Sequence, residues 1–167
     1  MFEIKINYHL EELHDLVRQY PMVVIEEGEK VMDIIVRRLE SEVVMRTPRG
    51  VGGVAGLAGS IHGAVVSQGF PIHGVVGTPL EYAIVVEEGR RPNRAMPPVG
   101  PIALWAQRKL GVNVEDARSV GFVIARSIGK KGFKGAHMFR KAWEQLERWA
   151  QTELQSIVDR VSERLSD

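Results

Sequence analysis

The chain has 167 residues, of which 44% are apolar and 26% are charged, a composition typical of a globular domain. It contains no cysteine, which excludes disulfides, thiolate chemistry and zinc sites with cysteine ligands. No apolar run approaches 18 residues and the first residues do not resemble a signal peptide, so we expect no membrane partner and synthesis in the cytoplasm. The length is that of one domain, and we expect residues 1–167 to fold as a single unit.

The net charge of +1 is the sum of three unequal segments. Residues 1–89 carry 7 basic and 13 acidic side chains, residues 90–141 carry 12 basic and 2 acidic, and residues 142–167 carry 3 basic and 6 acidic. Charge segregation of this size is informative about binding partners rather than about the fold. The basic segment is suited to contact nucleic acid or the acidic part of a neighbouring copy, and the alternative is neutralisation within one fold.

The N-terminal part begins with alternating apolar and polar residues over Phe2–Asn7, which predicts a short strand. A helical apolar pattern runs from Leu10 to Val17, and Pro21 breaks or restarts it. A longer helix is predicted from about Met22 to Arg46. Its apolar residues recur at spacings of three and four, as in a helix packed on one side: Val31, Met32, Ile35, Leu39 and Val43.

The middle of the chain is rich in turn residues. Residues 49–59 hold five of the 17 glycines, which predicts a mobile loop. The short β-branched runs Ile61–Ser67 and Ile72–Gly77 predict a β-hairpin. Tyr82–Glu88 fits either a strand or a short helix.

Three helices are predicted in the C-terminal part. Pro101 suits the first turn of a helix that Gly111 ends, and Asn113 is a candidate cap for the next helix, which ends near Gly129. The last helix spans about Ala136–Leu165.

That last helix is about 30 residues long, or roughly 45 Å, which exceeds the width of a compact domain of this size. The segment 156–167 therefore needs another surface, and we expect Ile157, Val161 and Leu165 to pack against a sister subunit. The alternative is a frayed terminal turn or two.

Three signatures follow one another at an unusual spacing: Gly-Leu-Ala-Gly-Ser-Ile at residues 56–61, Tyr-Ala-Ile-Val-Val-Glu-Glu-Gly at 82–89, and a proline-rich stretch at 92–101. Their order resembles the tail-component family of long-tailed double-stranded DNA phages, the small neck and tail-completion proteins. The resemblance covers roughly residues 40–146. It departs from the family pattern at Ala55, where threonine is usual, and in the enlarged loop 49–55. The matching positions are Pro48, Gly56, Leu57, Ser60, Ile61, Tyr82, Ala83, Val86, Glu87, Gly89 and the late Phe139–Ala142 element.

The resemblance implies a structural protein without an active site. Its members are subunits of an oligomeric ring at the phage head–tail junction or the tail end, and the ring leaves a channel for DNA. The implied partners are head-connector or tail proteins, and the implied location is the virion, after assembly in the host cytoplasm from a phage or prophage gene. The resemblance also favours a short helix or turn at residues 82–88.

The residues themselves give no catalytic or metal-binding constellation. The glycine-rich loop lacks the lysine of a phosphate-binding loop, and Ser60 has no evident base. Glu87 and Glu88 are adjacent and are expected to point apart. His62 and His73 are expected to lie near each other in the hairpin, without carboxylates to complete a metal site. We therefore predict no catalytic residue, cofactor or metal.

Two basic clusters are the candidate contact residues. They flank glycines or prolines, so both are predicted to be loops that contact phosphates or an acidic partner, and the alternative is a pair of solvated loops. The clusters are Arg90, Arg91 and Arg94, and Lys130, Lys131 and Lys134.

The predicted fold is α+β, a small antiparallel sheet packed by helices, with a long C-terminal helix. The predicted function is a ring-forming assembly protein of the phage head–tail junction or tail end. The alternative from another class is a stand-alone nucleic-acid-binding protein that uses residues 90–141. A third possibility, a small hydrolase, lacks its catalytic residues.

Overall fold

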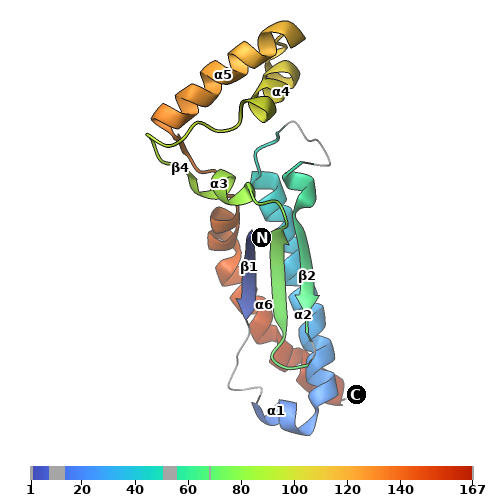
Figure 1. Cartoon of the computed structure of the whole chain (residues 1–167). Helices are drawn as coiled ribbons and strands as arrows, with labels where there is room; N and C mark the ends of the chain where they lie inside the picture. The colour runs from blue at the N-terminus through green and yellow to red at the C-terminus, as the bar shows by residue number, and fades with distance from the viewer. Residues whose placement is uncertain (1, 8–13, 51–55, 68, 167) are drawn as a thin grey trace.

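A computed structural model describes residues 2–7, 14–50, 56–67 and 69–166. Figure 1 shows an elongated body, in which a small sheet lies beside two long helices, and a helical hairpin that projects from one end of that body. This arrangement confirms the α+β prediction, with its small antiparallel sheet and long C-terminal helix.

The sheet has three antiparallel strands in the order β1-β3-β2. Strands β2 (His62–Val66) and β3 (His73–Thr78) form the predicted hairpin, with Val66 opposite His73. Strand β1 (Phe2–Asn7) pairs with the other edge of β3. The N-terminal strand is thus joined to a hairpin that lies more than 50 residues further along the chain.

The core lies between one face of the sheet and two long helices, α2 (Pro21–Arg46) and α6 (Met138–Ser166). Helix α2 approaches the sheet closely, because a Cβ placed on Gly63 or Gly74 would lie only 2.5 or 2.6 Å from the side chain of Val36. The predicted apolar stripe of α2 is buried in this core: Val31, Met32, Ile35, Leu39 and Val43.

Three short helices complete the body. Helix α1 (His14–Gln19) precedes α2, and the 3-10 helix η3 (Ala58–Ser60) precedes β2. Residues 83–88 form helix α3 (Ala83–Glu88), so the helix alternative for this segment is confirmed. Residues 51–55 of the glycine-rich loop lie outside the described residues, and its predicted mobility stays a prediction.

The expectation that the end of α6 lacks a surface in its own chain is wrong for two of the three named residues. Ile157 and Val161 are 1% and 0% exposed, and only Leu165, at 39%, is open to solvent. A helix of this length exceeds the width of a compact globule, but the body is elongated and α2 runs beside α6 (Figure 1). Ile157 and Val161 are thus core residues.

The hairpin that projects from the body is called the arm, residues 89–137. It leaves through β4 (Gly89–Arg90) and returns through β5 (Phe133–Lys134), which pair antiparallel. Between them lie α4 (Val99–Leu110) and α5 (Val114–Lys131), as predicted. Gly111, with a φ of 68°, supplies the left-handed residue that ends α4.

Small residues hold the two arm helices together. A Cβ on Gly121 would lie 2.8 Å from the backbone nitrogen of Ala103, so the two backbones nearly touch there. The contact residues, called the seam, are Ala103, Ala106, Ala117, Gly121 and Ala125. None of them belongs to the apolar core of the body. The arm therefore has its own packing, separate from that of the body.

Candidate functional site

The joint between arm and body is built by the motif at residues 82–89. Glu87 in α3 is almost fully buried, and its carboxylate oxygens accept hydrogen bonds from the backbone N–H groups of Phe139 and Arg140, each at 3.0 Å. These N–H groups belong to the first turn of α6, where backbone N–H groups have no acceptor within the helix. Glu87 therefore caps α6 from 52 residues away, and its negative charge suits the positive end of the helix.

Backbone contacts fix the same joint. Gly89 has a φ of 79°, and a Cβ on it would lie 2.4 Å from the nitrogen of Gly135. The carbonyls of Val86 and Glu87 accept hydrogen bonds from the N–H groups of Ala136 and His137, at 2.8 and 3.1 Å. Both glycines are required where the two chain segments cross. The motif thus joins the two ends of the arm to the body, and both carboxylate oxygens of Glu87 accept hydrogen bonds in this joint.

The two basic clusters, separate in sequence, meet at the base of the arm. The β4–β5 pairing sets Gly89 opposite Lys134, and the N–H groups of Asn93 and Arg94 donate to the carbonyls of Lys130 and Gly129, at 3.1 and 2.9 Å. The six predicted contact residues form one group, here called the basic collar: Arg90, Arg91, Arg94, Lys130, Lys131 and Lys134.

The prediction that both clusters are loops is wrong in part. Arg90 and Lys134 lie in β4 and β5, while Lys130 and Lys131 form the last turn of α5. Lysines in that position are stabilised by the negative end of the helix. The helix continues past Gly129 to Lys131, and Gly132 ends it.

The collar side chains differ in exposure. Arg90 is half-buried, one of its terminal nitrogens donates to the carbonyl of Ala95, and its Nε finds no hydrogen-bond partner among the described residues. The other five are exposed, and none of them forms an ion pair within the described part of the chain. Arg90 is therefore part of the joint, and five cations are free to meet a partner.

The charge segregation follows the shape of the molecule. The arm carries 10 basic and 2 acidic side chains, a balance of +8, whereas the rest of the chain carries 12 basic and 19 acidic, a balance of −7. The separation of arm from body keeps most of these charges apart. Within the described part of the chain, no ion pair neutralises the five exposed collar residues, as the alternative to a partner surface would require.

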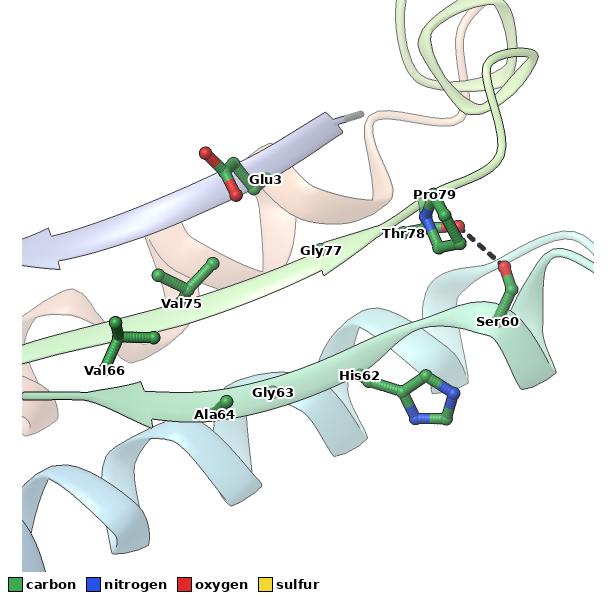
Figure 2. A pocket seen from close by; sticks show the side chains of 10 residues that line it. All are labelled: Glu3, Ser60, His62, Gly63, Ala64, Val66, Val75, Gly77, Thr78 and Pro79. Carbon is green, nitrogen blue, oxygen red and sulfur yellow. Dashed lines mark hydrogen bonds between the residues drawn. The ribbon is translucent and has the colours of Figure 1, made fainter.

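A second candidate site lies on the sheet face that none of the described helices covers. It is a shallow hollow of about 220 Å³, shown in Figure 2, and its floor consists of small or apolar residues. These residues, called the sheet patch, are Ala64, Val66, Val75 and Gly77.

The hydroxyls at one end of this hollow are engaged. Ser60 Oγ donates to the carbonyl of Leu57 at 2.8 Å, so Thr78 is the donor in the 2.7 Å contact between the two hydroxyls. Thr78 in turn accepts from the N–H of Leu80 at 3.2 Å. Both hydrogen bonds of the Ser60 hydroxyl are thus made within the fold, to Leu57 and Thr78.

The expectation that His62 and His73 lie near each other is wrong. The register sets His62 opposite Gly77 and His73 opposite Val66, so the two histidines stand near opposite ends of the hairpin. Among the described residues, no three histidine or carboxylate side chains come together in a way that could hold a metal ion. No described helix is long and apolar enough to span a membrane.

Sequence reasoning missed the union of the two basic clusters and the bond from Glu87 to α6. Pairings between segments about 40 residues apart have no periodic signal in the sequence. The one available sign was the glycine at the junction of each segment, Gly89, Gly132 and Gly135, where any side chain would strike the crossing backbone. Comparisons with protein-family models, curated proteins and solved structures find no match to this chain.

Proposed function

We propose that this protein is a structural virion-assembly protein, a subunit of an oligomeric ring at the head–tail junction or tail end of a long-tailed phage or prophage. The observation that carries the proposal is the basic arm on an acidic body, whose five exposed collar cations have no partner within the described chain. Charge of opposite sign on two parts of one subunit suits contacts between neighbouring subunits.

The motifs that carry the family resemblance support the proposal in a second way. The described residues of the first motif are structural: Leu57 and Ile61 are buried, and Ser60 is bonded within the fold. The second motif forms the joint through Ala83, Glu87 and Gly89. Motifs that build a scaffold, without catalytic groups, fit an assembly protein. The proposed partners are head-connector or tail proteins, and the proposed location is the virion.

Inactivation of the gene tests the proposal directly. Particles induced from the phage or prophage genome are imaged by electron microscopy. We expect filled heads and tails that fail to join, or tails with an unfinished end, and recovery when the intact gene is supplied from a plasmid. Infectious particles of normal form without the gene product would rule the proposal out. The cheapest prior observation is whether portal, capsid and tail-tube genes lie beside this gene.

The collar supplies a second test with a stability control. We expect charge reversal of the five exposed collar residues to glutamate to lower the yield of infectious particles. Each exposed change should alter the free energy of unfolding by within about 0.5 kcal/mol, with a further loss of about 0.3–1 kcal/mol where glutamate replaces Lys130 or Lys131 at the negative end of α5. The protein should therefore stay folded, and its melting curve is the stability control. A normal yield of infectious particles from the variant would show that the collar residues are solvated charges without a partner.

The charge of the arm also favours a second candidate, a nucleic-acid-binding protein that acts on its own through residues 90–141. This candidate predicts that the isolated protein binds duplex DNA with an affinity that falls steeply with salt. The slope of log K against log salt is about −0.9 for each phosphate contacted. A binding titration from low to physiological salt decides the matter, and absence of binding at low salt removes this candidate.

A further inference from the structure

One face of the arm carries large apolar side chains that the described chain covers only in part. Four large side chains lie beside the seam, and Trp105 is 36% exposed while the other three are half-buried. None of them packs against the core of the body. These residues, called the arm strip, are Ile102, Trp105, Val120 and Ile124.

The four strip residues lie on one face of the arm. Each directly precedes a seam residue in the sequence, so each is turned by about 100° in the same sense from the line where the helices touch. Because α4 and α5 are antiparallel and both right-handed, equal turns from the seam lead to the same face of the pair. By the same reasoning Phe122, which directly follows the seam residue Gly121, lies on the opposite face.

The sheet patch is another apolar surface, and no helix among the described residues covers it. Antiparallel sheets with one face in water usually place polar residues on that face. Strand β1 follows this rule, with Glu3 and Lys5 paired at 3.2 Å. The outward positions of β2 and β3 mostly do not, and Val66 is 56% exposed. The patch thus has the composition of a surface that another element covers.

We propose that the arm strip of one copy packs on the sheet patch of the next copy. The arm projects past the end of the sheet, so the strip does not cover the patch of its own copy (Figure 1). A second copy is the favoured occupant because the arm, at +8, would then lie against a body of −7. Lysines border the strip at Lys109 and Lys131, whereas the patch is bordered by Glu3, which is paired with Lys5.

The pairing joins two different surfaces of the same chain, so it is head-to-tail and closes into a ring when the rotation between copies allows it. DNA is disfavoured as the occupant of the strip, because phosphates bind cations and leave aliphatic side chains such as Val120 and Ile124 uncovered. The inference deepens the proposed ring and depends on it for its biological setting.

Cysteine cross-linking tests the contact without background, since the chain has no cysteine. Ser127 is exposed and lies three residues after Ile124, on the border of the strip, and Ala64 is exposed in the patch. Ser127→Cys and Ala64→Cys are conservative single variants. With a short bis-maleimide, we expect a cross-linked dimer in a mixture of the two variants and none in either alone.

The double variant Ser127→Cys/Ala64→Cys should give a ladder of dimers, trimers and larger species, and the ladder should weaken as salt increases. The control is Phe122→Cys, on the opposite face of the arm, used in place of Ser127→Cys. Its yield of cross-linked product with Ala64→Cys should be lower by about tenfold or more, because only the strip face meets the patch. Circular dichroism of each variant confirms that it is folded.

The same variants placed in assembled particles separate this inference from the proposed function. Absence of the chain from purified particles would refute the proposed function. The cross-linking in solution would still test the contact between strip and patch. Presence in particles, without a link from Ser127→Cys to Ala64→Cys there or in solution, would overturn the contact alone. A link formed by Ser127→Cys by itself, or an equal link through Phe122→Cys, would also overturn it.

Discussion

Two adjacent carboxylates show how far a side chain's role depends on its surroundings. Glu87 is buried and bonded to the first turn of α6, whereas Glu88 is exposed. Both have the same chemistry and nearly the same place in the sequence. The difference arises because the α3 helix turns one side chain toward the start of α6 and the other toward solvent.

Glu87→Ala should therefore destabilise the protein while Glu88→Ala should not. Removal of Glu87 leaves two backbone N–H groups without their acceptor, and bonds to a charged group of this kind contribute about 1.5–3 kcal/mol. The exposed Glu88 should change the free energy of unfolding by within about 0.5 kcal/mol. Urea unfolding of both variants measures the difference. Equal stabilities would show that the α6 cap contributes nothing.

The carboxylate of Glu27 ties the end of α6 to the start of α2. It accepts from Lys30 Nζ at 2.7 Å and Arg164 Nη1 at 3.0 Å, and Glu26 also pairs with Arg164. The hydrogen bond from Lys30, helped by that from Arg164, holds the pKa of Glu27 below its ordinary value of 4.5, although burial acts in the opposite direction.

This lowered pKa gives the protein an acid-sensitive contribution to stability. A carboxyl whose pKa is lower in the folded state stabilises that state above about pH 4.5, and the contribution disappears as the pH falls through the folded-state pKa. We expect Glu27→Gln to lower the melting temperature at pH 7. Below pH 4.5, the melting temperature of this variant should fall less with decreasing pH than that of the parent. The exposed Glu29→Gln is the control. Parallel curves for Glu27→Gln and the parent would contradict the assignment.

At the scale of elements, the long helix α6 illustrates the limit of a length argument. Its three-four pattern predicts the helix correctly, and its bounds, Met138–Ser166, lie close to the predicted Ala136–Leu165. Length alone could not tell whether its end met a sister subunit or its own chain. Helix α2, a partner of comparable length, decided the outcome by lying beside it.

Truncation of single side chains distinguishes the buried apolar residues near the end of α6 from the exposed one. Ile157→Ala should lower the free energy of unfolding by about 2–5 kcal/mol, because it leaves a cavity between α2 and α6. Leu165→Ala, at an exposed position of the same helix, should cost within about 0.5 kcal/mol. Thermal unfolding of both variants gives the comparison. A small loss at Ile157 together with weaker self-association would restore the subunit-contact hypothesis for that residue.

At the scale of the whole molecule, the arm and the body are two packing units joined by β4 and β5. Arg90 and Phe133 stand opposite each other in that ribbon, so a two-residue Asn-Gly turn can replace residues 91–132. Because Glu87 and its partners in α6 remain, we expect the shortened protein to unfold cooperatively with a melting temperature close to that of the parent. Loss of cooperative unfolding would mean that the arm stabilises the body.

The sequence by itself determined most of the elements. Alternation predicted β1, three-four spacing predicted α2 and α6, and Gly111 marked the end of α4, because these signals arise from backbone geometry within a few residues. The positive charge of residues 90–141 is likewise a property of the sequence alone. Each of these features depends only on residues that are close together in the sequence, and so does not require knowledge of the tertiary structure.

Only the tertiary structure decided how the elements meet. It joined Arg90 to Phe133 and Glu87 to Phe139, and it buried Ile157 in the chain's own core. It also set the basic segment apart as an arm, and it left the sheet patch uncovered by the described part of the chain. Contacts between distant segments depend on the closure of long loops and on which surfaces fit together, and no residue pattern along the chain records that fit.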